Sequence, residues 1–198
     1  MPSLSLTDLV DVFSKAGTPR VTKVREIKNR EAYSPATDYY RRFREGVVEI
    51  HSLGRSKDSL GEILQTLPAN KVENYSEMVE GYRKWWGRKE ITWFNPPRGS
   101  YSYHNFTISV NPELGVEFDG RRHVIKLYTK ADTLAKNRVD LVHSILELSL
   151  SALSLERDRL CVLDVRNSKL FVSNGIMANA QAIIDAELAY IEALWPSL

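Results

Sequence analysis

The sequence predicts an α+β protein, in which a mixed β-sheet built from hairpins is flanked by helices. Two observations lead to this prediction. Residues 90–128 and 159–172 contain short runs of β-branched and aromatic residues separated by turn residues, a pattern typical of hairpins. Residues 132–155 and 176–195, and several segments before residue 87, instead carry apolar residues at helical spacing.

The clearest hairpin is expected over residues 114–128, which read LGVEFDGRRHVIKLY. Asp119 and Gly120 predict its turn, because a type I′ turn needs positive φ at both central residues and Asp-Gly tolerates this. A second hairpin is expected over 159–172, around Arg166-Asn167-Ser168. Two further strands are predicted at 90–94 and 103–110, with a loop rich in proline and glycine over 95–102 between them.

Helix signals dominate the first half of the chain. Ser5 or Thr7 predicts the start of a first helix, which Gly17-Thr18-Pro19 is expected to end. Ser34-Pro35 predicts the start of the next one. We therefore expect a helical N-terminal layer over residues 1–69 and an α+β core domain over 70–198, joined in one compact unit. Helices are predicted at 6–16, 35–51, 59–67, 75–86, 132–155 and 176–195.

Composition excludes several classes of protein. With 43% hydrophobic and 26% charged residues the chain resembles an ordinary globular domain, and it contains no apolar run long enough to cross a membrane. Its N-terminus lacks the pattern of a secretory signal. Cys161 is the only cysteine, so no internal disulfide and no Cys/His zinc module is expected, and a reducing cytoplasm is the predicted compartment. No glycine-rich cofactor loop and no serine-nucleophile motif occurs.

Positive charge is concentrated between Lys15 and Arg44. This stretch holds nine basic and three acidic residues, a local net of +6 in a chain whose overall net charge is +2. Such asymmetry permits an anionic partner, and we predict nucleic-acid binding through residues 20–44. The alternative is that these bases form a solvated face and pair with acids of the same helix. The predicted nucleic-acid contacts are Lys23, Arg25, Lys28, Arg41, Arg42 and Arg44.

A second candidate for nucleic-acid contact is the segment 83–98, where aromatic residues alternate with arginines. Such a combination can stack on unpaired bases, whereas tryptophans in mixed folds also fill the edges of a core. The residues concerned are Arg83, Trp85, Trp86, Arg88, Trp93, Phe94 and Arg98.

The order of the predicted elements resembles the PD-(D/E)XK nuclease superfamily, in particular its RecB-like branch. That core runs α-β-β-β-α-β, with an acid on an early strand and a D/E-x-K pair on the next. The segments that carry the resemblance are Tyr33-Ser34-Pro35 before a helix, residues 46–51 (GVVEIH), the 114–128 hairpin, the 132–155 helix and the strand from Leu160. The resemblance spans residues 33 to about 172.

The sequence departs from the family pattern at the positions of the family's catalytic residues. Lys126 takes the position of the family's acid, Tyr128 takes that of its lysine, and the spacing from glycine to histidine is one residue too long. A lysine would repel the Mg²⁺ that metal-dependent hydrolysis requires. The remaining carboxylates for an early-strand acid are Glu113, Glu117 and Asp119, of which Asp119 serves the turn.

Candidates for catalysis are accordingly Glu117, Asp164 and Lys126, where Glu117 and Asp164 would have to approach each other across the sheet. His51 is an alternative ligand but also suits a helix end. No metal site and no cofactor is predicted. The leading hypothesis is a nucleic-acid-associated or interaction protein on a nuclease-like scaffold that has lost its chemistry.

Two alternatives remain open from the sequence. One is an active Mg²⁺-dependent nuclease with a relocated site that uses Glu113, Glu117 or Asp164. The other is a structural or regulatory protein that forms a homo-oligomer or binds a protein partner through its amphipathic helices. Neither includes a membrane partner.

Overall fold

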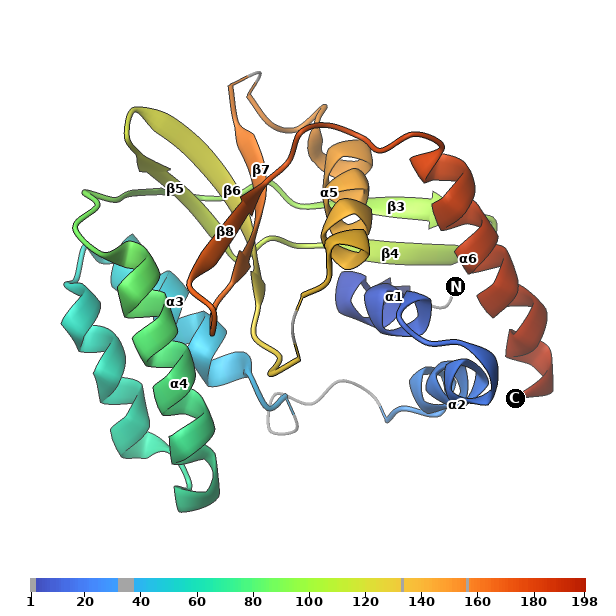
Figure 1. Ribbon diagram of the computed structural model, residues 1–198, viewed down its shortest axis with the longest axis horizontal. Coiled ribbons are helices and arrows are strands. Elements are labelled where there is room, and N and C mark those ends of the chain that lie inside the picture. Colours follow the sequence, from blue (N-terminus) through green and yellow to red (C-terminus); the bar gives the residue numbers. More distant parts are fainter. Residues whose placement is uncertain (1–2, 32–37, 133, 156) are drawn as a thin grey trace.

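The computed structural model describes residues 3–31, 38–132, 134–155 and 157–198. It is 50% helical and 20% strand, with mixed sheets flanked by helices, which confirms the α+β class. Figure 1 shows a central sheet with α3 and α4 on one side and α5 on the other, while α1, α2 and α6 lie beyond α5. None of the described helices is long and apolar enough to cross a membrane.

The main sheet has five strands in the order β2-β5-β6-β7-β8. Strands β2 (Thr92–Phe94) and β5 (Leu114–Phe118) are antiparallel, as are β5 and β6 (Arg121–Tyr128). Strand β7 (Arg159–Asp164) runs parallel to β6 and antiparallel to β8 (Lys169–Val172). The parallel pair is joined through α5 (Lys136–Leu150), as parallel neighbours require a long crossover.

The 114–128 hairpin is confirmed. Asp119 and Gly120 have φ values of +51° and +66°, as a type I′ turn demands. Leu114 lies opposite Ile125 and Val116 opposite His123. The predicted hairpin over 159–172 is also confirmed, with its turn between β7 and β8.

A second sheet was not predicted. It has the order β1-β4-β3, formed by β1 (Ser3–Ser5), β3 (Gly99–Tyr103) and β4 (Phe106–Val110). The expected loop over 95–102 is therefore wrong from Gly99 onwards. The two sheets are separate because the inward side chains of β4 and of β5, on either side of Pro112, enter different hydrophobic cores.

Apart from α2, which was not predicted, the helices match the predicted segments with shifted ends. Helix α1 (Leu6–Phe13) begins at Ser5, one of the two predicted caps, which forms a capping box with Asp8. Helix α2 (Gly17–Lys28) follows after three residues. The first helix ends at Phe13, before the predicted Ala16, and Gly17-Thr18-Pro19 form the first turn of α2. A proline is tolerated there because its missing N–H removes no intrahelical hydrogen bond. The remaining helical elements are α3 (Arg41–Ser52), the 3₁₀ segment η1 (Lys57–Thr66), α4 (Ala69–Trp86) and α6 (Ala180–Leu194).

Helix α3 begins at Arg41, later than the sequence predicted. Tyr39 and Tyr40 form a turn, and the Tyr39 carbonyl accepts a hydrogen bond from the Tyr75 hydroxyl at 2.5 Å. The predicted start at Ser34-Pro35, together with Tyr33, lies outside the described residues.

Two hydrophobic cores lie on opposite faces of the main sheet. The aromatic core is formed against α3, η1 and α4, and its rings are Phe43, Tyr75, Tyr82, Trp85 and Phe118. The aliphatic core is formed by α1, α2, α5, α6 and the second sheet, and Phe106 is its one fully buried ring among the described residues. Residues 3–69 thus contribute to both cores, and the division at residue 69 stays a prediction.

Candidate functional site

A groove of about 1660 Å³ lies between α3, the N-terminal helices and the last residues of β6. Side chains of β6 and the residues that follow it, Lys126 to Lys130, line one wall. The loop before β3 contributes Arg98, and β2 contributes Trp93. This groove is the largest of the described hollows that a ligand could enter, and it lies at one end of the main sheet.

A carboxylate–lysine pair occupies the centre of the groove. The Lys126 ammonium donates to Glu113 Oε1 at 2.5 Å and to the Asn111 carbonyl at 3.2 Å. The other oxygen, Glu113 Oε2, accepts the backbone N–H of Leu127 at 2.8 Å. Arg44 Nε lies 4.0 Å from Glu113. Glu113 is thus fixed by cations and a backbone donor, and its oxygens are already engaged.

Tyr128 and its neighbours form the part of the groove beyond Lys126. Burial raises the pKa of the Tyr128 phenol, and the adjacent Asp132 carboxylate adds to this rise. Burial opposes ionisation of Asp132, but the hydrogen bond from Arg138 and the nearby Tyr128 hydroxyl hold the pKa of this carboxyl below its ordinary value. Tyr128 therefore stays protonated at neutral pH and offers a hydroxyl.

The three candidates for catalysis lie on one face of the sheet but are not brought together. Glu117 is opposite Arg122, and Asp164 is opposite Tyr128. Six residues of β6 separate these two positions, which corresponds to about 20 Å along the strand. The expected approach of Glu117 and Asp164 across the sheet is therefore wrong.

Neither Asp164 nor Glu117 has the neighbouring oxygen or nitrogen ligands of a metal site among the described residues. Asp164 is buried and accepts the backbone N–H and side-chain amide of Asn167, at 3.2 and 2.9 Å, so it orders the turn between β7 and β8. Glu117 is exposed on the hairpin. Among the described residues no group of three histidine, cysteine or acidic side chains is placed to hold a metal ion.

His51 is buried rather than available as a ligand. Its Nε2 lies 2.6 Å from the Tyr82 hydroxyl, and its ring stacks on Trp86 with centroids 4.3 Å apart. Burial lowers the pKa of His51 to about 4, so the imidazole is neutral near pH 7.

Most residues of the predicted basic surface have polar partners within the molecule, and half of them pair with acids. Arg44 pairs with Asp38, Arg41 with Glu45, and Lys23 with Asp11 and Glu26. Arg42 donates to the Thr66 carbonyl and Lys28 to the Trp195 carbonyl. Of the six residues predicted to contact nucleic acid, Arg25 alone has no polar partner within the described parts of the chain.

The aromatic segment 83–98 divides between the core and the groove. Trp85 is buried and Trp86 stacks on His51, so neither faces the groove. Trp93 does line the groove and is half-buried, as are Tyr39 and Tyr40. Arg98 is exposed at the rim, and no described residue pairs with it.

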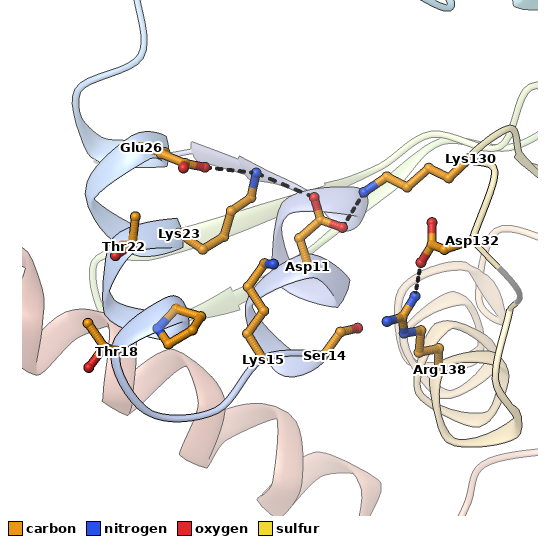
Figure 2. Close-up of a pocket in the computed structure, with 11 residues that line it drawn as sticks. Asp11, Ser14, Lys15, Thr18, Thr22, Lys23, Glu26, Lys130, Asp132 and Arg138 are labelled. Atoms are coloured by element: carbon orange, nitrogen blue, oxygen red, sulfur yellow. Dashed lines mark hydrogen bonds and ion pairs between the residues drawn. The ribbon is translucent and has the colours of Figure 1, made fainter. Parts of the chain in front are cut away.

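A second, smaller pocket of about 820 Å³ adjoins the groove and shares Lys23, Glu26 and Lys130 with it. Figure 2 shows Lys23 on α2 and Lys130 after β6 pointing from opposite sides toward Asp11 on α1. Below them Arg138 of α5 pairs with Asp132. The sequence does not predict this pocket, because two of the residues that meet in it, Asp11 and Lys130, are 119 residues apart.

Comparisons of the chain with protein-family models, with curated proteins and with solved structures find no match.

Proposed function

We propose that this protein binds nucleic acid in the groove beside β6, with a preference for single strands, and that it does not cleave the strand it binds. The observation that carries the proposal is the combination, in one groove, of three half-buried aromatic side chains with an arginine that no described residue neutralises. Aromatic rings stack on bases of any sequence, and cations contact the backbone phosphates. The contacts proposed here are Tyr39, Tyr40, Trp93 and Arg98.

The scaffold supports this proposal. The elements α4, β2, β5, β6, α5 and β7 follow one another in the α-β-β-β-α-β order of PD-(D/E)XK nucleases, apart from the inserted pair β3 and β4. Strand β5 is antiparallel to β6, and β6 is parallel to β7. This resemblance concerns the layout of the chain, while the function must come from the site itself.

The proposed loss of cleavage rests on Lys126. Mg²⁺ needs hard oxygen ligands, and the one carboxylate beside Lys126, Glu113, already binds the lysine ammonium and a backbone N–H. An active nuclease that combines Glu117 with Asp164 is disfavoured, since these residues lie far apart along the sheet. A cytoplasmic location belongs to the same proposal, because the lone Cys161 is buried and has no disulfide partner.

Binding is tested by fluorescence anisotropy with labelled oligonucleotides of about 10 nucleotides, single- and double-stranded, DNA and RNA. We expect single strands to bind best, and affinity to fall between about 50 and 200 mM salt. Arg98→Ala and Trp93→Leu should each weaken binding about tenfold. Arg88→Ala is the matched control, because Arg88 is also exposed but does not line the groove.

Absence of binding at low salt would overturn the proposal, as would an equal loss in the Arg88→Ala control. Incubation with Mg²⁺ or Mn²⁺ should leave the oligonucleotides intact. Cleavage that disappears in Glu113→Gln would instead favour the metal-dependent nuclease. A molecular size that rises with concentration, without any binding, would favour the oligomerising protein.

A further inference from the structure

The pocket next to the groove is a distinct recess with its own charged lining. Helix α1 contributes Asp11, the turn after it contributes Lys15, and α2 contributes Thr18, Thr22 and Lys23. Lys130 and Arg138 complete it from the opposite side, as Figure 2 shows. Its volume of about 820 Å³ falls in the range of small-molecule sites and leaves room for one nucleotide.

Three carboxylates line this pocket, and two of its lysines share one of them, Asp11. Glu26 also lies 3.4 Å from the Lys23 ammonium, and Asp132 pairs with Arg138. Asp11 Oδ2 faces the Lys23 ammonium at 3.5 Å, and Asp11 Oδ1 accepts from Lys130. Asp11 thus presents one oxygen to each lysine, as two oxygens of a bound phosphate would. An incoming phosphate can replace Asp11 as the partner of both lysines.

Three further groups in the pocket have no polar partner among the residues that the structure describes. Lys15 is exposed and forms no ion pair, and the hydroxyls of Thr18 and Thr22 form no hydrogen bond there. These groups supply one free positive charge and two O–H donors. A phosphate offers oxygens that accept from all of them.

The charge of the ligand follows from the charge of the lining. A phosphate monoester carries close to two negative charges near neutral pH, whereas each diester of a nucleic-acid backbone carries one. A monoester therefore competes better with Asp11 for two lysines, and it also exposes three terminal oxygens. In a nucleic acid such a group occurs only at the end of a strand.

We propose that this pocket binds the terminal phosphate of a nucleic-acid strand that lies in the adjoining groove. The inference rests on the proposed function and assigns its substrate class, a single strand with a phosphorylated end. Lys23 and Lys130 line both hollows, so a strand can pass from the groove into the pocket at this point.

The test compares three oligonucleotides of one sequence, with a 5′-phosphate, a 3′-phosphate or hydroxyls at both ends. We expect one phosphorylated form to bind about tenfold more tightly than the hydroxyl form, and the two arms identify which end enters the pocket. Equal affinity of all three forms would overturn the inference while leaving the groove function intact.

A second measurement keeps the two proposals separable. A nucleoside monophosphate and the corresponding nucleoside are titrated into the protein by calorimetry. Binding of the monophosphate alone supports the pocket even if no oligonucleotide binds, in which case only the groove function fails. If the nucleoside binds as tightly as the monophosphate, the pocket proposal is overturned.

Two substitutions with opposite expected effects give the sharpest test. Lys15→Ala should remove most of the preference for a phosphorylated end, because it deletes the free cation. Asp11→Asn should increase that preference severalfold, because it removes the competing carboxylate. Arg25→Ala is the matched control, since Arg25 is an exposed cation of α2 outside the pocket and pairs with no residue that the structure describes. A decrease in Asp11→Asn with unchanged thermal stability would contradict the inference.

Discussion

The two faces of the main sheet are covered in different ways. On one face α3 and α4 bury four aromatic rings against β5, β6 and β7, and β5 adds the ring of Phe118. On the other face α1, α2, α5 and α6 bury mainly leucine, isoleucine and valine. Buried tyrosines need partners for their hydroxyls, so the aromatic core contains hydrogen bonds such as those of Tyr75 to Tyr39 and of Tyr82 to His51.

On the aliphatic side, ion pairs at the surface connect distant elements instead. Arg20 of α2 pairs with Glu187 of α6, and Lys130 after β6 pairs with Asp11 of α1. The groove lies between α3 of the aromatic side and helices α1 and α2 of the aliphatic side. Tyrosine hydroxyls and His51 thus fix the packing inside the aromatic face, whereas ion pairs between distant elements lie at the surface of the aliphatic face, where a ligand can reach them. The aliphatic face also buries two polar side chains of α5, His143 and Ser144.

The largest effect is expected from cavities in the two cores. Phe43→Ala should lower the free energy of unfolding by about 3–5 kcal/mol, because this ring is fully buried. Ile145→Ala, at a fully buried position of the aliphatic core, should cost about 2–5 kcal/mol. Urea unfolding followed by circular dichroism measures both.

Tryptophan fluorescence sharpens this comparison, because Trp85, Trp86 and Trp93 belong to the aromatic side and Trp195 to the aliphatic side. Since both cores share one sheet, a Trp195→Phe variant should show fluorescence and circular dichroism transitions at the same urea concentration. Two separate transitions would mean that the two faces unfold independently.

The next effect is a dependence of stability on pH that originates in the aromatic core. Burial lowers the pKa of His51 from 6.5 to about 4 in the folded protein. Between these two pH values the unfolded chain binds a proton at His51 that the folded protein does not bind. The contribution of His51 to the free energy of unfolding is therefore complete above pH 6.5 and declines as the pH falls toward 4. The decline due to this residue amounts to about 3 kcal/mol.

Urea unfolding at about pH 7.5 and pH 5 checks this dependence. His51→Gln should flatten it, and the slope that remains should come from His123 and His143, whose pKa values burial also lowers. His104→Gln is the control, because the His104 side chain is 62% exposed. An unchanged pH profile in His51→Gln would show that the acid sensitivity has another origin.

The smallest effect is expected at the rim of the groove. Arg41 and Glu45 form an exposed ion pair one turn apart on α3, with 2.6 Å between Nε and Oε1. A double-mutant cycle with Arg41→Ala and Glu45→Ala should give a coupling energy of about 0.3–0.5 kcal/mol that decreases with salt. A coupling above 1 kcal/mol would mean that this pair holds the groove wall in place.

Local signals in the sequence were sufficient where the structure depends on a few adjacent residues. Asp119-Gly120 determined its hairpin through the φ values that these two residues tolerate, and Ser5 or Thr7 indicated the start of α1, which the structure places at Ser5. The length of α5 was predicted less well, since its apolar pattern extends to 155 while the helix ends at Leu150. A helix end depends on backbone hydrogen bonds that a hydrophobic period does not specify.

The candidate site depended on contacts between distant parts of the chain. The sequence identified Lys126, Glu113, Trp93 and Arg98, because their residue types stand out beside strands and turns. It also showed the excess of positive charge over residues 15–44. It did not show that acids elsewhere in the chain neutralise most of that charge.

Pairing was decided by the tertiary structure alone. Arg20 meets Glu187 across 167 residues, and Lys130 meets Asp11 across 119. Such pairs produce no periodic pattern in the sequence, because each involves only two residues whose positions are set by the packing of different elements. The sequence therefore determined the local elements and the amount of charge, whereas the folded arrangement determined which charges cancel and which remain free for a ligand.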